Sequence, residues 1–117
     1  MQFLIMTYEN PEDFSRREGE EAEAYFAEWM AYVDAIHQSG VVVSSAGLQP
    51  PETATSVTTR GGERTVQDGP YADSKEQLGG FFLIEVPDLD AALEWASRSP
   101  SAQRSGAEVR PIIPRTG

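Results

Sequence analysis

The run GFFLIEV (residues 80–86) constrains the fold more than any other part of the sequence. Side chains alternate between the two faces of a strand, so Phe82 and Ile84 point to one face. Phe81 and Leu83 point to the other face. A sheet that contains this strand therefore needs cover on both sides. Helices of the same chain can cover one side. A second copy of the chain is the simplest cover for the other, and a cleft for an apolar ligand is the alternative.

Apolar periodicity and turn residues predict the order of elements around this strand. A stripe at spacings of three and four indicates a long helix, and Asp88 is a typical N-cap for a second helix. The expected elements are a strand (2–8), a helix (20–38), a strand (41–48), a hairpin (56–67), a strand (80–86), a helix (89–99) and a last strand (107–113). This β-α-β-β-α-β order with an extra hairpin predicts an α+β, ferredoxin-like fold in one domain spanning residues 1–117.

The hairpin is the clearest local prediction. Gly61-Gly62 suits a two-residue primed turn, because both residues take a positive φ without a Cβ clash. Counting outward from the turn pairs Val57 with Val66 and Thr58 with Thr65 across the two strands. In the last strand Pro111 cannot donate to a ladder, which predicts an edge strand or a break.

Composition excludes several classes of function. The chain of 117 residues has no cysteine and one histidine, so disulfides, thiol catalysis and thiolate metal sites are excluded, and no metal or other cofactor is expected. The net charge of −10 disfavours nucleic acid as a partner. The apolar start at residues 3–6 is too short for a signal peptide, and no run approaches a membrane span. We therefore expect a cytoplasmic protein with no membrane partner.

The segment DGPYADSKEQLGGF (residues 68–81) resembles a family motif. DGPY followed by SKEQLGGF is similar to the block of DGPF proteins within the YCII-related family, typically DGPF, a short spacer and TKEQLGGF. Tyr71 replaces the usual Phe, Asp73 replaces Glu and Ser74 replaces Thr. IEVPDLDAALEWA and EVRPI also resemble the end of the family, so the likeness runs from about residue 3 to residue 113.

The resemblance implies a small bacterial protein that forms a homodimeric α/β barrel of ferredoxin-like units and has no settled activity. Some members are encoded beside extracytoplasmic-function sigma factors, which implies a sigma factor as a possible partner. The wider family is associated with a His–Asp pair, with the histidine on the first helix. Here that helical position falls near Trp29 and Met30, and His37 lies about two turns later. The pair therefore does not carry over to this chain.

Three charged residues of the motif are candidates for chemistry. Asp68 and Glu76 are predicted to converge as an acid and a base, with Lys75 holding an anionic group of a ligand. The alternative is structural: an Asp at a turn commonly accepts hydrogen bonds from backbone amides, and surface ion pairs contribute little. Gly79-Gly80 allows a positive φ or the close approach of another backbone, such as that of a dimer mate.

Three further residues are predicted to contact a ligand. Tyr71 can stack on a ligand or fill the core, and Tyr8 can line a pocket. Arg110 shares a strand face with Glu108 and can reach a pocket or form a cross-strand or intersubunit pair. Tyr25 and Trp29 can also line a pocket, but aromatic residues at helical spacing are usually core. His37 is placed to interact with the negative end of the helix dipole.

Two function classes follow. The first is a dimeric small-molecule binding or regulatory module, linked to a sigma factor. The second is an acid/base enzyme of isomerase or lyase type that acts on a small compound, anionic or neutral, through Asp68 and Glu76.

Overall fold

The computed structural model of the chain describes residues 1–115. Alternation of apolar residues and turn chemistry produce the elements in the expected order. They are β1 (Gln2–Glu9), α1 (Pro11–Ser15), a 3₁₀ turn η1 (Gly19–Glu21), α2 (Ala22–Gln38), β2 (Val42–Gly47), a second 3₁₀ turn η2 (Pro51–Thr53), β3 (Thr55–Arg60), β4 (Glu63–Asp68), β5 (Gln77–Glu85), α3 (Leu89–Ser97), α4 (Pro100–Arg104) and β6 (Gly106–Pro111).

Two antiparallel sheets and four α-helices make an α+β fold. The main sheet has the strand order β2-β5-β1-β6, and β3 pairs with β4 in a separate two-stranded sheet. The main sheet's order is consistent with the predicted ferredoxin-like arrangement. The strand β6, which contains Pro111, lies at an edge of this sheet as predicted. An edge strand tolerates proline because one side of it has no neighbouring strand to which an N–H would donate.

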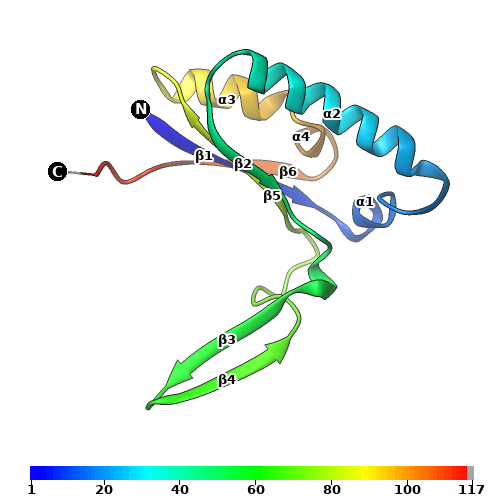
Figure 1. Cartoon of the computed structure of the whole chain (residues 1–117), viewed down its shortest axis with the longest axis vertical. Coiled ribbons are helices and arrows are strands. Elements are labelled where there is room, and N and C mark those ends of the chain that lie inside the picture. Colours follow the sequence, from blue (N-terminus) through cyan, green and yellow to red (C-terminus); the bar gives the residue numbers. More distant parts are fainter. Residues whose placement is uncertain (116–117) are drawn as a thin grey trace.

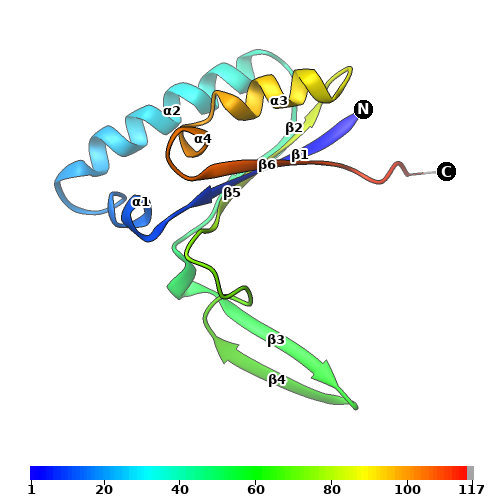
Figure 2. The same cartoon turned by 180° about the vertical axis from the view of Figure 1, so that it is seen from behind.

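The helices all lie on one face of the main sheet (Figures 1 and 2). The core forms between this face and the helices, from side chains that include Phe3, Ile5, Ile36, Phe82 and Ile84. Strict alternation along β1, half-buried then buried, shows that only every second residue reaches this core.

The other face of the sheet carries apolar side chains that no helix of the chain covers. Leu4 and Met6 on β1, with Phe81 and Leu83 on β5, are only partly buried. The structure thus confirms that β5 is apolar on both faces, and it leaves one of them open.

The hairpin formed by β3 and β4 is confirmed in register. Val57 faces Val66, Thr58 faces Thr65, and Gly61 and Gly62 have φ values of 56° and 81°. The hairpin leaves the sheet on the side away from the helices (Figure 1). It raises the radius of gyration to 16.0 Å, against about 13 Å for a compact domain of similar length. We call residues 55–67 the arm.

Two short helices were not predicted. Asn10-Pro11 begins α1, because the Asn10 side chain accepts from the Asp13 amide at 2.8 Å and proline suits the first helical turn. Ser99 and Pro100 begin α4 in the same way, so the polar stretch that follows α3 is helical. Helix α3 ends at Ser97, two residues before the predicted end. The predicted N-cap Asp88 is confirmed, with its carboxylate accepting from the Ala91 amide at 2.9 Å.

Within residues 1–115, the structure has no helix that is both long and apolar enough to span a membrane.

Candidate functional site

A cavity of about 750 Å³ lies between α2 and the edge strand β2. Its walls are mostly apolar, and polar side chains stand at two places around it. The lining residues are Thr7, Glu9, Arg17, Glu18, Tyr25, Phe26, Trp29, Val33, His37, Ser45, Ala46, Gly47, Leu48, Gln49, Pro50, Gly79, Gly80 and Phe82.

Glu9, Arg17 and Tyr25 form a buried polar cluster in the cavity wall. Glu9 is 2% exposed at the end of β1, and Tyr25 is 3% exposed on the first turn of α2. Arg17 forms an ion pair with one carboxylate oxygen of Glu9, and the Tyr25 hydroxyl donates to the other. Arg17 Nε in turn donates to the Tyr25 hydroxyl at 3.1 Å. Each of the three side chains is therefore held by the other two.

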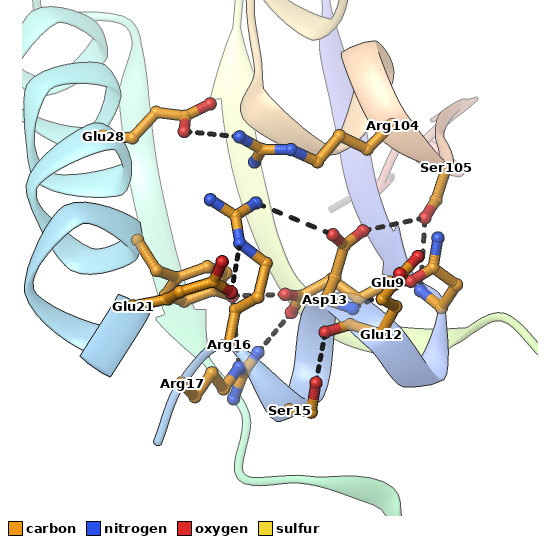
Figure 3. Close-up of polar contacts among 12 residues, drawn as sticks. Glu9, Glu12, Asp13, Ser15, Arg16, Arg17, Glu21, Glu28, Arg104 and Ser105 are labelled. Atoms are coloured by element: carbon orange, nitrogen blue, oxygen red, sulfur yellow. Dashed lines mark hydrogen bonds and ion pairs between the residues drawn. The ribbon is translucent and has the colours of Figure 1, made fainter. Parts of the chain in front are cut away.

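The backbone completes the cluster. Arg17 donates to the carbonyl of Leu48, which leads out of β2, and its guanidinium lies 4.8 Å from the centre of the Phe14 ring. Arg17 thus joins the loop after α1 to the far side of the cavity. Figure 3 shows a neighbouring network beside it, in which Asp13 accepts from Ser105 at 3.2 Å. That network fixes α1 against the start of β6.

Burial and hydrogen bonding keep Tyr25 and Arg17 protonated at neutral pH. Burial raises the pKa of Tyr25 well above its usual range, and the bond to the Glu9 carboxylate raises it further. Burial lowers the pKa of Arg17, but the bond to Glu9 and its charge outweigh this effect, so the net pKa is raised. At neutral pH the cluster therefore presents a phenol and a guanidinium, not a phenolate base.

The adjacent glycines of the motif make room for this cluster and for the neighbouring strand β2. A Cβ on Gly79 would overlap the Glu9 carboxylate, and one on Gly80 would lie 2.9 Å from the Ala46 carbonyl oxygen of β2. Neither glycine has a positive φ. The expected close approach to these glycines is thus present, but its partners belong to the same chain. The Glu9 carboxylate approaches Gly79, and the backbone of β2 approaches Gly80.

His37 and Ser45 provide the second polar position of the cavity. The Nδ1 atom of His37 lies 2.8 Å from the Val33 carbonyl oxygen, which can only accept, so Nδ1 carries a proton. In the neutral ring Nε2 then accepts from Ser45 Oγ, at 3.2 Å. The bond to Val33 agrees with the expected place of His37 at the carboxyl end of α2, and the ring also faces the cavity.

A second hollow, of about 700 Å³, lies beside the DGPY loop and is lined by two of the predicted site residues, Asp68 and Lys75. Glu76 and Tyr71 are not among its lining residues. Tyr71 is 80% exposed, and the side chain of Glu76 is exposed as well. The loop is shaped by Gln77, whose amide donates to the carbonyls of Ala72 and Ser74 at 2.8 Å each. Whether Asp68 and Glu76 act as an acid and a base stays a prediction.

Tyr8 and Arg110 lie elsewhere, on the open face of the sheet. The Tyr8 hydroxyl donates to Glu108 at 3.3 Å, and Arg110 pairs with the other oxygen of Glu108 at 2.7 Å. Burial, followed by the charge of Glu108, raises the pKa of Tyr8. Neither residue lines either hollow. Arg110 and Glu108 thus pair within β6, and not across two strands as expected.

Sequence reasoning did not select Glu9 and Arg17, and it treated Tyr25 and Trp29 chiefly as core. One signal existed for Glu9. Alternation from Phe3 and Ile5 places Glu9 on the core face of β1, where a carboxylate requires a buried partner. Nothing in the sequence shows that Arg17 is this partner, because the two meet only through the loop after α1.

The YCII-related domain matches residues 1–116. The chain belongs to the YCII-related family. An uncharacterised protein of Rhizobium meliloti is 33% identical to it over 114 residues, covering 96% of this chain and 92% of the relative.

Among solved structures, the chain is similar to 5-chloro-2-hydroxyhydroquinone dehydrochlorinase from Burkholderia phenoliruptrix, described in complex with 2,5-dihydroxybenzoquinone. The TM-score is 0.54 at 17% identity, with 97% of this chain and 94% of the other covered. This likeness concerns the fold. In the YCII-related chain itself, no group of three His, Asp or Glu side chains within residues 1–115 is arranged to hold a metal ion.

Proposed function

We propose that this protein is a small-molecule binding module whose ligand occupies the cavity between α2 and β2. One observation carries the proposal: a cavity of about 750 Å³ with apolar walls has fixed polar groups at two places. Small-molecule sites have this composition, in which apolar walls supply affinity and a few placed polar groups supply orientation. The buried cluster of Glu9, Arg17 and Tyr25 is pre-organised, so a ligand would not have to order it.

The lining indicates the class of ligand. Phe26, Trp29 and Phe82 offer flat apolar surface, which fits a ring. Glu9 and Arg17 compensate each other's charge, so the cluster favours hydroxyl or carbonyl groups over a strongly charged one. We therefore propose a small ring compound with oxygen substituents. The structural neighbour's dihydroxybenzoquinone is a compound of this kind and is the first molecule to test.

The test uses the chain's two tryptophans, of which Trp29 lines the cavity. Trp95→Phe leaves Trp29 as the only indole, so fluorescence then reports on the cavity alone. Hydroxylated benzenes, benzoates and quinones are titrated, and each apparent binding is repeated by calorimetry. A ligand of the cavity changes Trp29 emission at the concentrations at which heat is released.

A matched pair of variants locates the ligand. Phe26 on α2 and Leu93 on α3 are both about half exposed, but only Phe26 lines the cavity. Phe26→Ala should weaken binding by about tenfold, through lost apolar contact. Leu93→Ala should leave it unchanged. Equal effects of the two substitutions, or no effect of either, would place the ligand elsewhere.

We also propose that two copies pair through the open faces of their sheets, as a dimeric α/β barrel of the DGPF type. The support is the uncovered apolar surface made by Leu4, Met6, Phe81 and Leu83. The molar mass in solution tests this pairing. A sigma factor stays a predicted further partner, tested by co-purification from a bacterium that encodes both.

The alternative function is an acid/base enzyme, an isomerase or a lyase, that acts in the second hollow. It is favoured by one observation, that Asp68 and Lys75 line the same hollow. If this alternative is right, a ligand that stabilises the wild-type protein loses its effect in Asp68→Asn and keeps it in Phe26→Ala. The cavity proposal predicts the reverse pattern.

A further inference from the structure

The arm has one apolar face, and that face is exposed. Val57 and Val66 are direct partners across the hairpin, so both point to the same side. They are 58% and 55% exposed. A two-stranded hairpin is marginally stable in water by itself, and this pair of valines adds little to it while solvated. The arm is therefore suited to lie against another surface.

The charge of the arm indicates which kind of surface. Arg64 faces Thr59 two register positions from the valines, so it belongs to the same face of the hairpin. Asp68 lies at the base of the hairpin, opposite Thr55, and beyond it the arm carries Arg60, Arg64 and Glu63. This part has a net charge of +1, in a chain whose net charge is −10. Another copy of this chain is thus a strongly acidic surface to which the arm is electrostatically attracted.

Helix α2 presents a surface that matches the arm. Phe26 and Met30 are 48% and 54% exposed and lie four residues apart, so they are neighbours on the helix surface. Glu23 and Asp34, three residues before Phe26 and four after Met30, are exposed at the two ends of this pair. The α2 surface is thus an apolar pair with a carboxylate at each end. It complements the arm, which has two valines with an arginine beside them.

The arm and the α2 surface of the same chain lie on opposite sides of the main sheet. The helices lie above the sheet and the arm leaves below it (Figure 1). A chain therefore cannot place its own arm on its own α2. A second copy seated on the open face of the sheet lies on the same side as the arm, with its own helices turned outward.

We propose that the arm of each protomer lies across α2 of a second copy, with Val57 and Val66 on Phe26 and Met30 and with Arg64 beside an acidic end of that pair. This inference rests on the proposed pairing of two copies. Because Phe26 lines the ligand cavity, the arm also forms part of the rim of the partner's cavity. Each site is then completed by the other chain.

A cysteine cross-link tests the contact directly, because the natural chain has no cysteine. Met30→Cys and Val66→Cys chains, one of them tagged, are co-expressed and oxidised. We expect a disulfide-linked heterodimer of one tagged and one untagged chain. The matched control replaces Thr65, which neighbours Val66 and points to the opposite face of the arm. A Thr65→Cys chain with the Met30→Cys chain should give little product. Equal yields from the two pairs, or none from the first, would overturn the proposal.

A charge exchange provides the second measurement. Arg64→Glu should raise the dissociation constant of the dimer by about tenfold. Glu23→Arg or Asp34→Arg in the same chain should recover most of this loss, whereas Glu94→Arg, on the exposed side of α3, should not. A wild-type protein that stays monomeric at all concentrations overturns the arm contact. Trp29 titration of that monomer still tests the cavity, so the two failures are distinguishable.

Discussion

The cavity beside α2 and the hollow beside the DGPY loop have nearly the same volume, about 750 and about 700 Å³, but they hold their polar groups in different ways. In the first, Glu9 and Tyr25 are buried, Arg17 is partly buried, and the three are bonded to one another. In the second, Asp68 and Lys75 are exposed on the end of a strand and on a loop. The conspicuous charged motif of the sequence is thus the less organised of the two sites.

The difference has an energetic basis. A buried charge that loses its partner keeps the full cost of desolvation, so each member of the first cluster depends on the others. Exposed charges are solvated whether or not they are paired, and their pairing contributes little. Substitutions should therefore have large effects in the first hollow and small effects in the second, and the following four experiments measure this contrast.

The largest effect is expected from Glu9→Gln. The substitution leaves the partly buried guanidinium of Arg17 without its counter-charge and should lower the free energy of unfolding by about 3 kcal/mol. Urea denaturation of both proteins measures the change. Glu94→Gln, at an exposed position of α3, is the control and should change stability by less than about 0.5 kcal/mol. If the two substitutions cost the same, the buried cluster is not a stabilising unit.

Gly79→Ala should have the next largest effect. The new methyl group occupies the space of the Glu9 carboxylate, so it should lower the free energy of unfolding by about 2 kcal/mol. Gly106→Ala is the control, because a Cβ there meets no atom within 4 Å. Thermal and urea unfolding report both changes. A neutral Gly79→Ala would show that the carboxylate moves freely, contrary to a pre-organised site.

Alkaline pH should destabilise the protein through its buried tyrosines. Burial raises the pKa of Tyr25 above its unfolded value of 10.0, and burial raises that of Tyr32 to about 12. Above pH 10 the unfolded chain loses protons that the folded chain keeps. The free energy of unfolding should therefore fall as pH rises from about 10, by about 1.4 kcal/mol per pH unit for each tyrosine.

Urea unfolding between pH 8 and pH 11 measures this slope. Tyr25→Phe should remove the part of this pH dependence that comes from Tyr25. Tyr71→Phe, at a position 80% exposed, is the matched control and should leave the slope unchanged. Identical slopes for the wild-type protein and Tyr25→Phe would contradict a buried phenol at this position.

The smallest effect is expected from Asp68→Asn in the second hollow. Asp68 is exposed, so the free energy of unfolding should change by less than about 0.5 kcal/mol. A loss of more than about 1.5 kcal/mol would show that the carboxylate is tied into the structure. The contrast between the two hollows would then disappear.

Local patterns in the sequence determined much of the architecture. Gly61-Gly62 and the alternation on each side predicted the hairpin register residue by residue, because a primed turn and a period of two leave one solution. The long helix and the Asp88 cap were predicted for the same reason, since their signals lie within a few neighbouring residues. The two apolar faces of β5 also followed from alternation alone.

The tertiary structure decided which of these residues meet. Glu9 and Tyr25 bond across 16 positions of sequence, and the cavity also takes its wall from β2 and β5. Gly79 has an evident role only when the Glu9 carboxylate beside it is known. Asp68 and Glu76 are close in sequence but do not line a common hollow. Spacing along the chain predicts local geometry, whereas a site depends on distances through space that only the packed fold sets.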